Sequence, residues 1–178
     1  LKDVDEQLIK EIDKDTHRLK TIAERFSKIG SKPSLTPVEL KPVLENALTY
    51  MRNRSSKKIT FKTSLPKGAI LVNLNVPLFE WVIENLCKNA IDAMETSGTI
   101  TITALSEGER LILDVSDTGK GIPKSHYKTV FKPGFTTKQR GWGLGLSLVK
   151  RIIEENHGGK IFVKTSEPGK GTTFRIIL

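Results

Sequence analysis

The chain has 178 residues, a single cysteine and a formal net charge of +9. This length can bury one core of ordinary size, and one cysteine excludes an internal disulfide. No apolar run approaches the roughly 20 residues of a membrane span, and no signal-peptide pattern is present. The basic residues are scattered, without a tract longer than two, so we expect no nucleic-acid partner.

The first 30 residues predict one long amphipathic helix, because apolar residues recur there at steps of three and four. Gly30 is suited to end this helix, and Pro33 blocks its continuation. Such a helix cannot bury its apolar stripe alone, so we expect partner helices in a bundle or coiled coil. The chain begins at Leu1 inside this pattern and without Met, which we interpret as a fragment of a longer protein.

After a short linker over residues 31–37, the pattern changes to a mixture of helices and strands. Alternating and 3.6-residue periodicities predict helices over 42–54, 77–94 and 144–156, and strands over 59–63, 69–74, 99–105, 110–116, 160–165 and 172–178. Residues 117–142 are rich in glycine and predict a long, mobile loop. The order favours an α+β fold, a two-layer α/β sandwich whose mixed sheet is covered by helices on one face, preceded by the long helix.

Amide side chains occur four residues apart on the predicted helix over 77–94. Asn85 and Asn89 therefore share one helical face, and Lys88 and Asp92 flank that face. Amide oxygens are hard ligands suited to Mg²⁺, which also takes oxygen atoms from phosphates and water. Amides that only form hydrogen bonds at a helix interface would be equally consistent with the spacing. Cys87 points away from both amides, so we expect a packed core thiol.

An acidic residue, Asp117, follows an apolar strand and begins a glycine turn with Gly119 and Gly121. A carboxylate in such a place can accept a hydrogen bond from an exocyclic amine such as adenine N6. Glycines permit close approach of the backbone to a ligand. An ordinary Asp-Thr-Gly turn would look the same, so this motif is weak by itself.

Three glycines, Gly141, Gly143 and Gly145, precede an apolar helix, and backbone N–H groups at a helix start bind phosphates. The pattern follows no first strand of a dinucleotide fold and lacks the Gly-Lys-Ser/Thr of a P-loop. Lys138 is a candidate cation for the terminal phosphate, and Phe131 and Phe135 are candidates for anchoring the loop. The ordered motifs together indicate a site for ATP and a divalent metal.

In this order the motifs resemble the N box, F box and glycine boxes of sensor histidine kinases. That catalytic domain belongs to the ATPase superfamily of DNA gyrase, mismatch-repair ATPases and heat-shock chaperones. The resemblance covers residues 36–178 and implies that Asn89 coordinates Mg²⁺ with help from Asn85, and that Asp117 binds adenine. It also implies a lid over residues 117–142. The full set of implied nucleotide-binding positions is Asn85, Lys88, Asn89, Asp92, Asp117, Gly119, Gly121, Ile122, Lys138, Gly141, Gly143, Leu144, Gly145, Leu146 and Thr172, with Asn85, Asn89 and Lys138 catalytic.

Residues 1–32 resemble the second helix of the family's dimerisation and phosphotransfer hairpin. The family's acceptor histidine is followed by an acidic residue and proline, whereas His17 is followed by Arg18 and Leu19. We therefore expect the acceptor histidine outside this fragment and no autophosphorylation by the fragment alone. The resemblance implies that this chain is a cytoplasmic domain. It also implies a homodimeric parent protein that is compatible with an anchor in the inner membrane and that passes the phosphate to a response regulator. The F box also departs from the family, with Gly134 before Phe135 where two phenylalanines are usual.

Two other functions share the expected fold. An ATP-hydrolysing switch of the gyrase or chaperone type uses a glutamate four residues before the metal-binding asparagine as the base for water. This chain has Asn85 at that position, and Glu84 is displaced about 100° around the helix, which favours phosphoryl transfer to a protein side chain. A nucleotide-binding regulator without kinase activity is the second alternative.

Overall fold

A computed structural model describes Thr16 and residues 34–108, 110–138 and 141–178. The helix expected over residues 1–32, including His17, falls outside the described residues except for Thr16. Residues 34–178 form one unit that is described by itself. Among the described residues, no helix has the length and apolar character needed to cross a membrane.

The main sheet of this unit has five strands in the order β2-β4-β5-β7-β6. The strands are β2 (Ile59–Ser64), β4 (Gly98–Glu107), β5 (Arg110–Asp117), β6 (Lys160–Glu167) and β7 (Gly171–Ile177). β2 runs parallel to β4, and every other neighbouring pair is antiparallel. The sheet is therefore mixed, as the sequence predicts, and β2 and β6 are its two edges.

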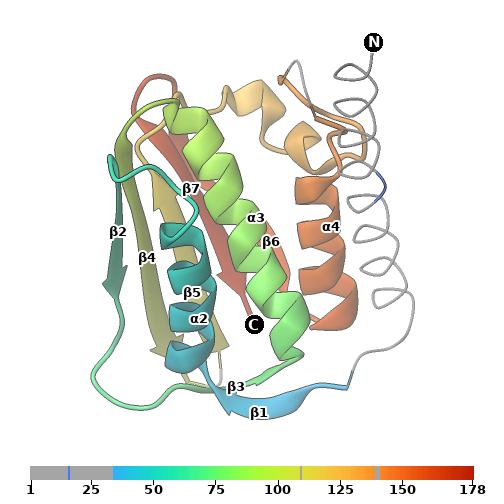
Figure 1. Cartoon of the computed structure of the whole chain (residues 1–178). Coiled ribbons are helices and arrows are strands. Elements are labelled where there is room, and N and C mark those ends of the chain that lie inside the picture. The colour runs from blue at the N-terminus through green and yellow to red at the C-terminus, as the bar shows by residue number, and fades with distance from the viewer. Residues whose placement is uncertain (1–15, 17–33, 109, 139–140) are drawn as a thin grey trace, which may run out of the picture. The chain divides into compact units, whose positions relative to one another are not determined.

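Three helices pack on one face of this sheet (Figure 1). They are α2 (Leu40–Arg52), α3 (Val76–Met94) and α4 (Gly145–Arg151), and α4 continues as a π-helical turn over Ile152–Asn156. Alternate residues of the central strands point toward the helices, so Ile100 and Ile102 of β4 and Leu113 of β5 are fully buried. This arrangement confirms the predicted two-layer α+β fold.

Helix α3 lies at the centre of the helical layer and contributes the largest share of the core. Its buried side chains are Leu78, Phe79, Val82, Ile83, Leu86, Cys87, Ala90 and Met94. Cys87 is fully buried, and burial, with a smaller contribution from Glu84, raises the pKa of its thiol to about 12. Cys87 is thus an unreactive core residue, as expected.

The structure corrects the expected linker and one helix start. β1 (Thr36–Glu39) pairs antiparallel with β3 (Leu71–Leu74) in a separate two-stranded sheet, so the expected linker over 31–37 ends in a strand. β1 carries little local signal, because so short a strand is stabilised mainly by its pairing with β3, whereas β3 itself lies within the strand expected over 69–74. Pro42 is the third residue of α2 and not the first, a position whose N–H also has no partner inside the helix.

The segment 117–142 has more structure than the glycine content predicts. It contains two 3₁₀ turns, Lys124–His126 and Thr129–Phe131. Phe131 is buried and packs edge-to-face on Phe174, with ring centroids 6.1 Å apart. Apolar side chains spaced too irregularly to form a helix therefore still anchor part of this segment to the core, and two short turns interrupt the expected long loop.

Candidate active site

A cation and two oxygen atoms meet beside helix α3. The ammonium of Lys138 donates hydrogen bonds to Asn89 Oδ1 at 3.0 Å and to Asp92 Oδ2 at 2.6 Å. Asn89 and Asp92 lie one turn apart on α3, whereas Lys138 comes from the glycine-rich segment. The Lys138 backbone N–H also donates to the hydroxyl of Thr136 at 3.1 Å, which fixes the local turn. The structure thus brings together three of the predicted site residues.

Asn85 lies one turn earlier on α3 and has different contacts. Its amide nitrogen donates to the carbonyl oxygen of Trp81 at 2.9 Å. Its side-chain oxygen faces the start of α4, where a Cβ added to Gly145 would lie only 3.1 Å away. Gly145 therefore allows the start of α4 to approach the Asn85 side-chain oxygen closely. Lys88 is exposed on the same helix.

The carboxylate of Asp117 lies at the end of β5, opposite Thr172 in β7. Asp117 Oδ1 accepts a hydrogen bond from the backbone N–H of Gly119 at 2.8 Å. Burial raises the pKa of the Asp117 carboxyl, and backbone hydrogen bonds from Gly119 and Thr172 oppose that shift only in part. A half-buried carboxylate at the end of a strand is suited to accept a hydrogen bond from a polar ligand group.

Two glycines allow the turn after Asp117 to pack tightly between α3 and the β6–β7 connection. A Cβ at Gly119 would lie 2.7 Å from the Cβ of Ala93, and the next N–H, of Lys120, donates to the Ala93 carbonyl oxygen at 3.0 Å. Gly121 has φ +74°, and a Cβ there would overlap the Glu167 carbonyl oxygen. We expected Gly119 and Gly121 to allow the backbone to approach a ligand, and in the structure they also allow it to approach Ala93 and Glu167.

The sequence analysis missed Ser166, which links this turn to β7. Its hydroxyl accepts a hydrogen bond from the Ile122 N–H at 2.7 Å and lies 2.9 Å from the hydroxyl of Thr172. Its carbonyl oxygen accepts from the Tyr127 hydroxyl at 2.6 Å. A lone serine in a strand has no spacing signal, so only the folded arrangement identifies it.

The expected phosphate loop leads into the first turn of α4. Gly143 has φ +64°, and a Cβ there would lie 2.5 Å from the Gly134 backbone. The Gly143 carbonyl oxygen accepts from the Gly134 N–H at 3.1 Å, so the two arms of the segment are joined. Gly141 lies near Thr136 and Lys138, while Leu144 and Leu146 are half-buried at the start of α4. The backbone N–H groups at the start of α4 therefore lie beside Asn85.

The oxygen atoms on α3 are compatible with a magnesium ion. Asn89 and Asp92 direct their oxygens at one positive charge, the Lys138 ammonium. Within the described ranges, no group of three or more His, Cys, Asp or Glu residues is placed to hold a metal. Mg²⁺ needs only a small number of ligands from the protein, because it usually keeps several waters and shares phosphate oxygens.

Comparison with known proteins assigns the chain to a family. Residues 74–178 match the family described as "Histidine kinase-, DNA gyrase B-, and HSP90-like ATPase". The sensor histidine kinase ZraS of Salmonella typhi is 35% identical over 169 residues, which cover 93% of this chain and 36% of that protein. The chain thus spans about a third of this curated relative.

Solved structures show the same fold. The catalytic domain of the histidine kinase ThkA superposes with a TM-score of 0.74 at 29% identity, covering 82% of this chain and 95% of that one. ThkA in complex with the response regulator protein TrrA superposes with a TM-score of 0.75 at 28% identity, covering 94% of this chain and 48% of that one. The chain therefore belongs to the histidine kinase-, DNA gyrase B- and HSP90-like ATPase family and contains an ATP-binding catalytic domain homologous to those of sensor histidine kinases.

Proposed function

We propose that this chain is the catalytic part of a sensor histidine kinase, which transfers the γ-phosphoryl group of Mg-ATP to a histidine outside residues 1–178. The parent protein would be a homodimer that relays the phosphate to a response regulator and is anchored in the inner membrane. In this proposal residues 1–32 supply one helix of the dimerisation hairpin, and residues 36–178 supply the catalytic domain. The observation that carries the proposal is the meeting of Lys138 with Asn89 and Asp92 on α3.

The nucleotide would bind between α3, the turn after Asp117 and the start of α4. Asp117 would accept a hydrogen bond from the adenine amine, with Thr172 at the same end of the sheet. Asn89, helped by Asn85, would hold Mg²⁺, which when bound would neutralise phosphate charge. Backbone N–H groups from Gly141 to Leu146 would bind phosphate oxygens.

Lys138 would move its charge from Asp92 to the γ-phosphate when the nucleotide binds. Phosphoryl transfer needs little covalent participation by the protein, because catalysis depends on positioning and charge neutralisation. A lysine on a segment that already reaches α3 can supply such a charge without a large movement. Lys88 and Asp92 would contact the phosphates or the waters around the metal.

The described histidines are poorly placed as acceptors. In His157, Nδ1 lies 2.9 Å from the Ile152 carbonyl oxygen and Nε2 accepts from the Asn75 N–H at 3.2 Å, so both ring nitrogens are engaged. Burial lowers the pKa of His157, although these hydrogen bonds oppose the shift. His126 packs edge-to-face on Phe135 at 5.3 Å between centroids. The sequence around His17 also lacks the acceptor pattern.

A decisive experiment supplies the missing acceptor. The 178-residue chain is incubated with γ-labelled ATP and Mg²⁺, alone and with a separate hairpin segment from a homologous kinase that carries its acceptor histidine. We expect acid-labile, alkali-stable label on the added hairpin and none on the chain itself. Stoichiometric acid-labile label on the chain, lost in His17→Ala, would overturn the assignment of the acceptor.

Slow hydrolysis is expected in the same assay, because an asparagine cannot take a proton from water and Asn85 occupies the position of the hydrolytic base. Rapid phosphate release that does not depend on the hairpin would favour the ATPase-switch alternative. Binding of ATP without either reaction would favour the regulator without kinase activity.

A further inference from the structure

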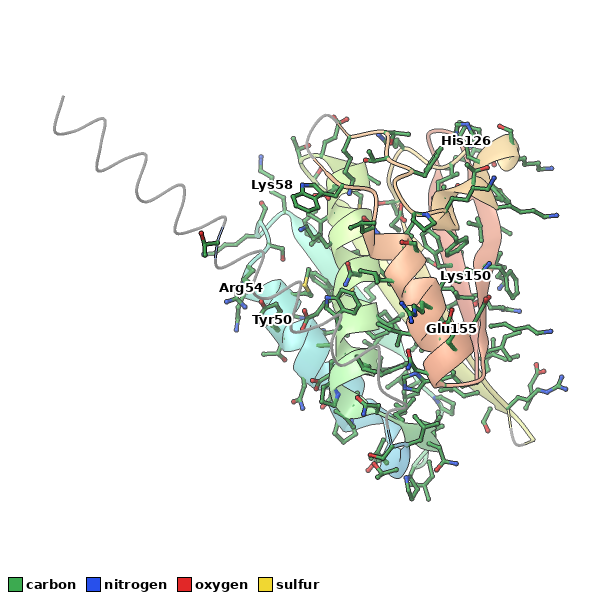
Figure 2. All side chains as sticks on the ribbon, turned by 90° about the vertical axis from the view of Figure 1, so that its right-hand side faces the viewer. Tyr50, Arg54, Lys58, His126, Lys150 and Glu155 are labelled. Atoms are coloured by element: carbon green, nitrogen blue, oxygen red, sulfur yellow. The ribbon has the colours of Figure 1, made fainter. Side chains whose placement is uncertain are left out.

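A basic surface borders β2, one of the two edges of the sheet, outside the proposed nucleotide site. Residues 46–79 contain six basic residues, Arg52, Arg54, Lys57, Lys58, Lys62 and Lys67, and no aspartate or glutamate. We call the first five of these the basic edge. Figure 2 shows Arg54 and Lys58 on one side of the view, with Lys150 and Glu155 of the α4 region on the other.

The basic edge is not neutralised by the part of the chain that the structure describes. The ion pairs among the described residues are made by other cations, such as Lys138, Lys164 and Arg175, and none includes a residue of the basic edge. On the outer face of the sheet, Lys62 has Thr101 of β4 as its register partner, which is neutral. Five exposed cations without counter-charges create a positive potential that favours an anionic partner.

Two of these cations are held in place by aromatic rings. The Arg54 guanidinium carbon lies 3.9 Å from the centre of the Tyr50 ring, and that of Arg52 lies 5.8 Å from the centre of the Phe61 ring. A guanidinium stacked on a ring keeps its N–H donors available around its rim, where they match the two oxygens of a carboxylate. The stacking also reduces the entropy lost when an anion binds.

The position of the cations relative to β2 indicates the shape of the partner. Within the described residues β2 pairs only with β4, so the backbone groups on its other side have no strand partner. Ile59 and Phe61 point to the helical face of the sheet, and Lys62 points to the opposite face, since side chains alternate along a strand. Arg52 over Phe61 and Lys62 therefore place positive charge on both faces of the same free edge.

We infer that β2 binds an extended acidic segment of a protein partner, which adds to the sheet as a further strand. Such a segment also alternates its side chains, so its carboxylates would meet Arg52 on one face and Lys62 on the other. Arg54, Lys57 and Lys58 precede β2 in the chain, so they would bind acidic residues of the partner beside the first residues of β2. Backbone hydrogen bonds supply affinity in this mode of binding, and the side chains supply specificity.

The test uses a synthetic peptide of strand length, about six residues, that alternates glutamate and threonine. Binding to the 178-residue chain is measured by fluorescence anisotropy, with a glutamine-for-glutamate peptide as the neutral control. A third peptide carries N-methyl groups on alternate residues and cannot donate to the edge. We expect binding that weakens with salt, is lost with the neutral peptide and falls about tenfold on N-methylation.

Variants locate the site. Lys58→Glu and Arg54→Gln should each weaken peptide binding about three- to tenfold. Lys160→Glu should not, although it is an exposed lysine in β6, at the opposite edge of the same sheet. All three variants should keep wild-type ATP affinity, which shows that they fold. Hydrogen exchange of residues 59–64 should slow when the acidic peptide binds.

Three results would overturn the inference. The first is no binding of the acidic peptide. The second is equal loss in Lys58→Glu and Lys160→Glu, which would indicate a general charge effect. The third is binding that is unchanged by N-methylation but is matched by anionic phospholipid vesicles, which would make the basic edge a membrane-facing surface.

Discussion

The Lys138 ammonium lies 2.6 Å from Asp92 Oδ2, so a residue of the glycine-rich segment is bound directly to helix α3. The two side chains are 39% and 38% exposed, respectively, which means that water screens their attraction. Such a pair contributes about 0–1 kcal/mol to stability. The contact therefore costs little to break, and Lys138 can exchange its partner for a phosphate.

Replacement of Lys138 by glutamine should weaken ATP binding about tenfold or more, because a charge-assisted hydrogen bond is worth about 1.5–3 kcal/mol. ADP binding should change less, since it lacks the γ-phosphate. The melting temperature should stay within about 1–2 °C of wild type, because the ion pair is exposed. Calorimetric titration checks the affinities, with Lys132→Gln, an exposed lysine of the same segment, as the control. Equal ATP affinity for Lys138→Gln and wild type would remove Lys138 from the site.

Asp117→Asn should separate binding from stability. In the proposed site the amide would lack the charged acceptor for the adenine amine, so ATP affinity should fall by about 1.5–3 kcal/mol, and the preference for ATP over GTP should narrow. Burial raises the pKa of Asp117, so ionisation of this group disfavours folding above that pKa, and the neutral amide removes this penalty. The melting temperature at pH 7 should therefore be equal to or higher than that of wild type. A large loss of stability would show that the carboxylate is mainly structural.

The pH dependence of ATP binding follows from the same group. Below its raised pKa, Asp117 is protonated and loses its charge, so affinity should fall as pH decreases through that value. Asp117→Asn should lack this step. Titrations between pH 7 and the acid limit of the fold compare the two proteins.

The pH dependence of stability expected from Asp114 is opposite in sign to that from Asp117, because Asp114 is the centre of a charge cluster on the helix-free face of the sheet. Its carboxylate accepts two hydrogen bonds from Arg175, at 2.7 and 2.8 Å, and one from Lys164 at 2.8 Å. Burial raises the pKa of Asp114, but these partners outweigh it and leave the pKa lowered. Stability from Asp114 is thus present above its unfolded pKa of about 3.9 and is lost as pH falls through the lower folded value.

We therefore expect Asp114→Asn to destabilise the fold by about 1–3 kcal/mol at pH 7 and to reduce the loss of stability on acidification. Glu167→Gln is the matched control, since Glu167 pairs with Lys170 while 62% exposed and should cost less than about 0.5 kcal/mol. Urea unfolding at several pH values measures both. An Asp114→Asn protein as stable as the control would show that the cluster contributes nothing.

Much of the fold could be predicted because its signals are local. The apolar periodicity of α3 and the alternation in β4 and β5 each identify an element without knowledge of its neighbours. β3 is also expected, within residues 69–74, whereas β1 has no such pattern because it depends on pairing with β3, which is distant in sequence. The anchoring of Phe131 on Phe174 also joins residues far apart in sequence, so the glycine content of the segment was the stronger signal and predicted too little structure.

Some residues of the candidate site could also be predicted from the sequence, and others could not. Asn89, Asp92 and Lys138 could be selected by residue type and motif order, and the structure brings them together. The helical spacing of Asn85 and Asn89 suggested a matched pair, but Asn85 donates to Trp81 and faces Gly145, because the approach of α4 is set by tertiary packing. Ser166 could not be predicted, since its role depends on the junction of three segments.

Ser166→Ala should weaken nucleotide binding without a comparable loss of stability. The change leaves the Ile122 N–H without its 2.7 Å acceptor and removes a partner 2.9 Å from the Thr172 hydroxyl, so the turn after Asp117 loses its link to β7. Affinities for ATP and ADP should fall equally, about five- to tenfold, because the base end of the site is affected and the phosphate end is not. Ser166→Thr, which keeps the hydroxyl, should restore most of the affinity. Ser116→Ala is a close control, since its hydroxyl pairs with Thr173 at the same 2.9 Å in the next register position of the sheet. If Ser116→Ala and Ser166→Ala lowered ATP affinity equally, or if ATP were affected far more than ADP, Ser166 would not be the residue that positions the adenine end of the site.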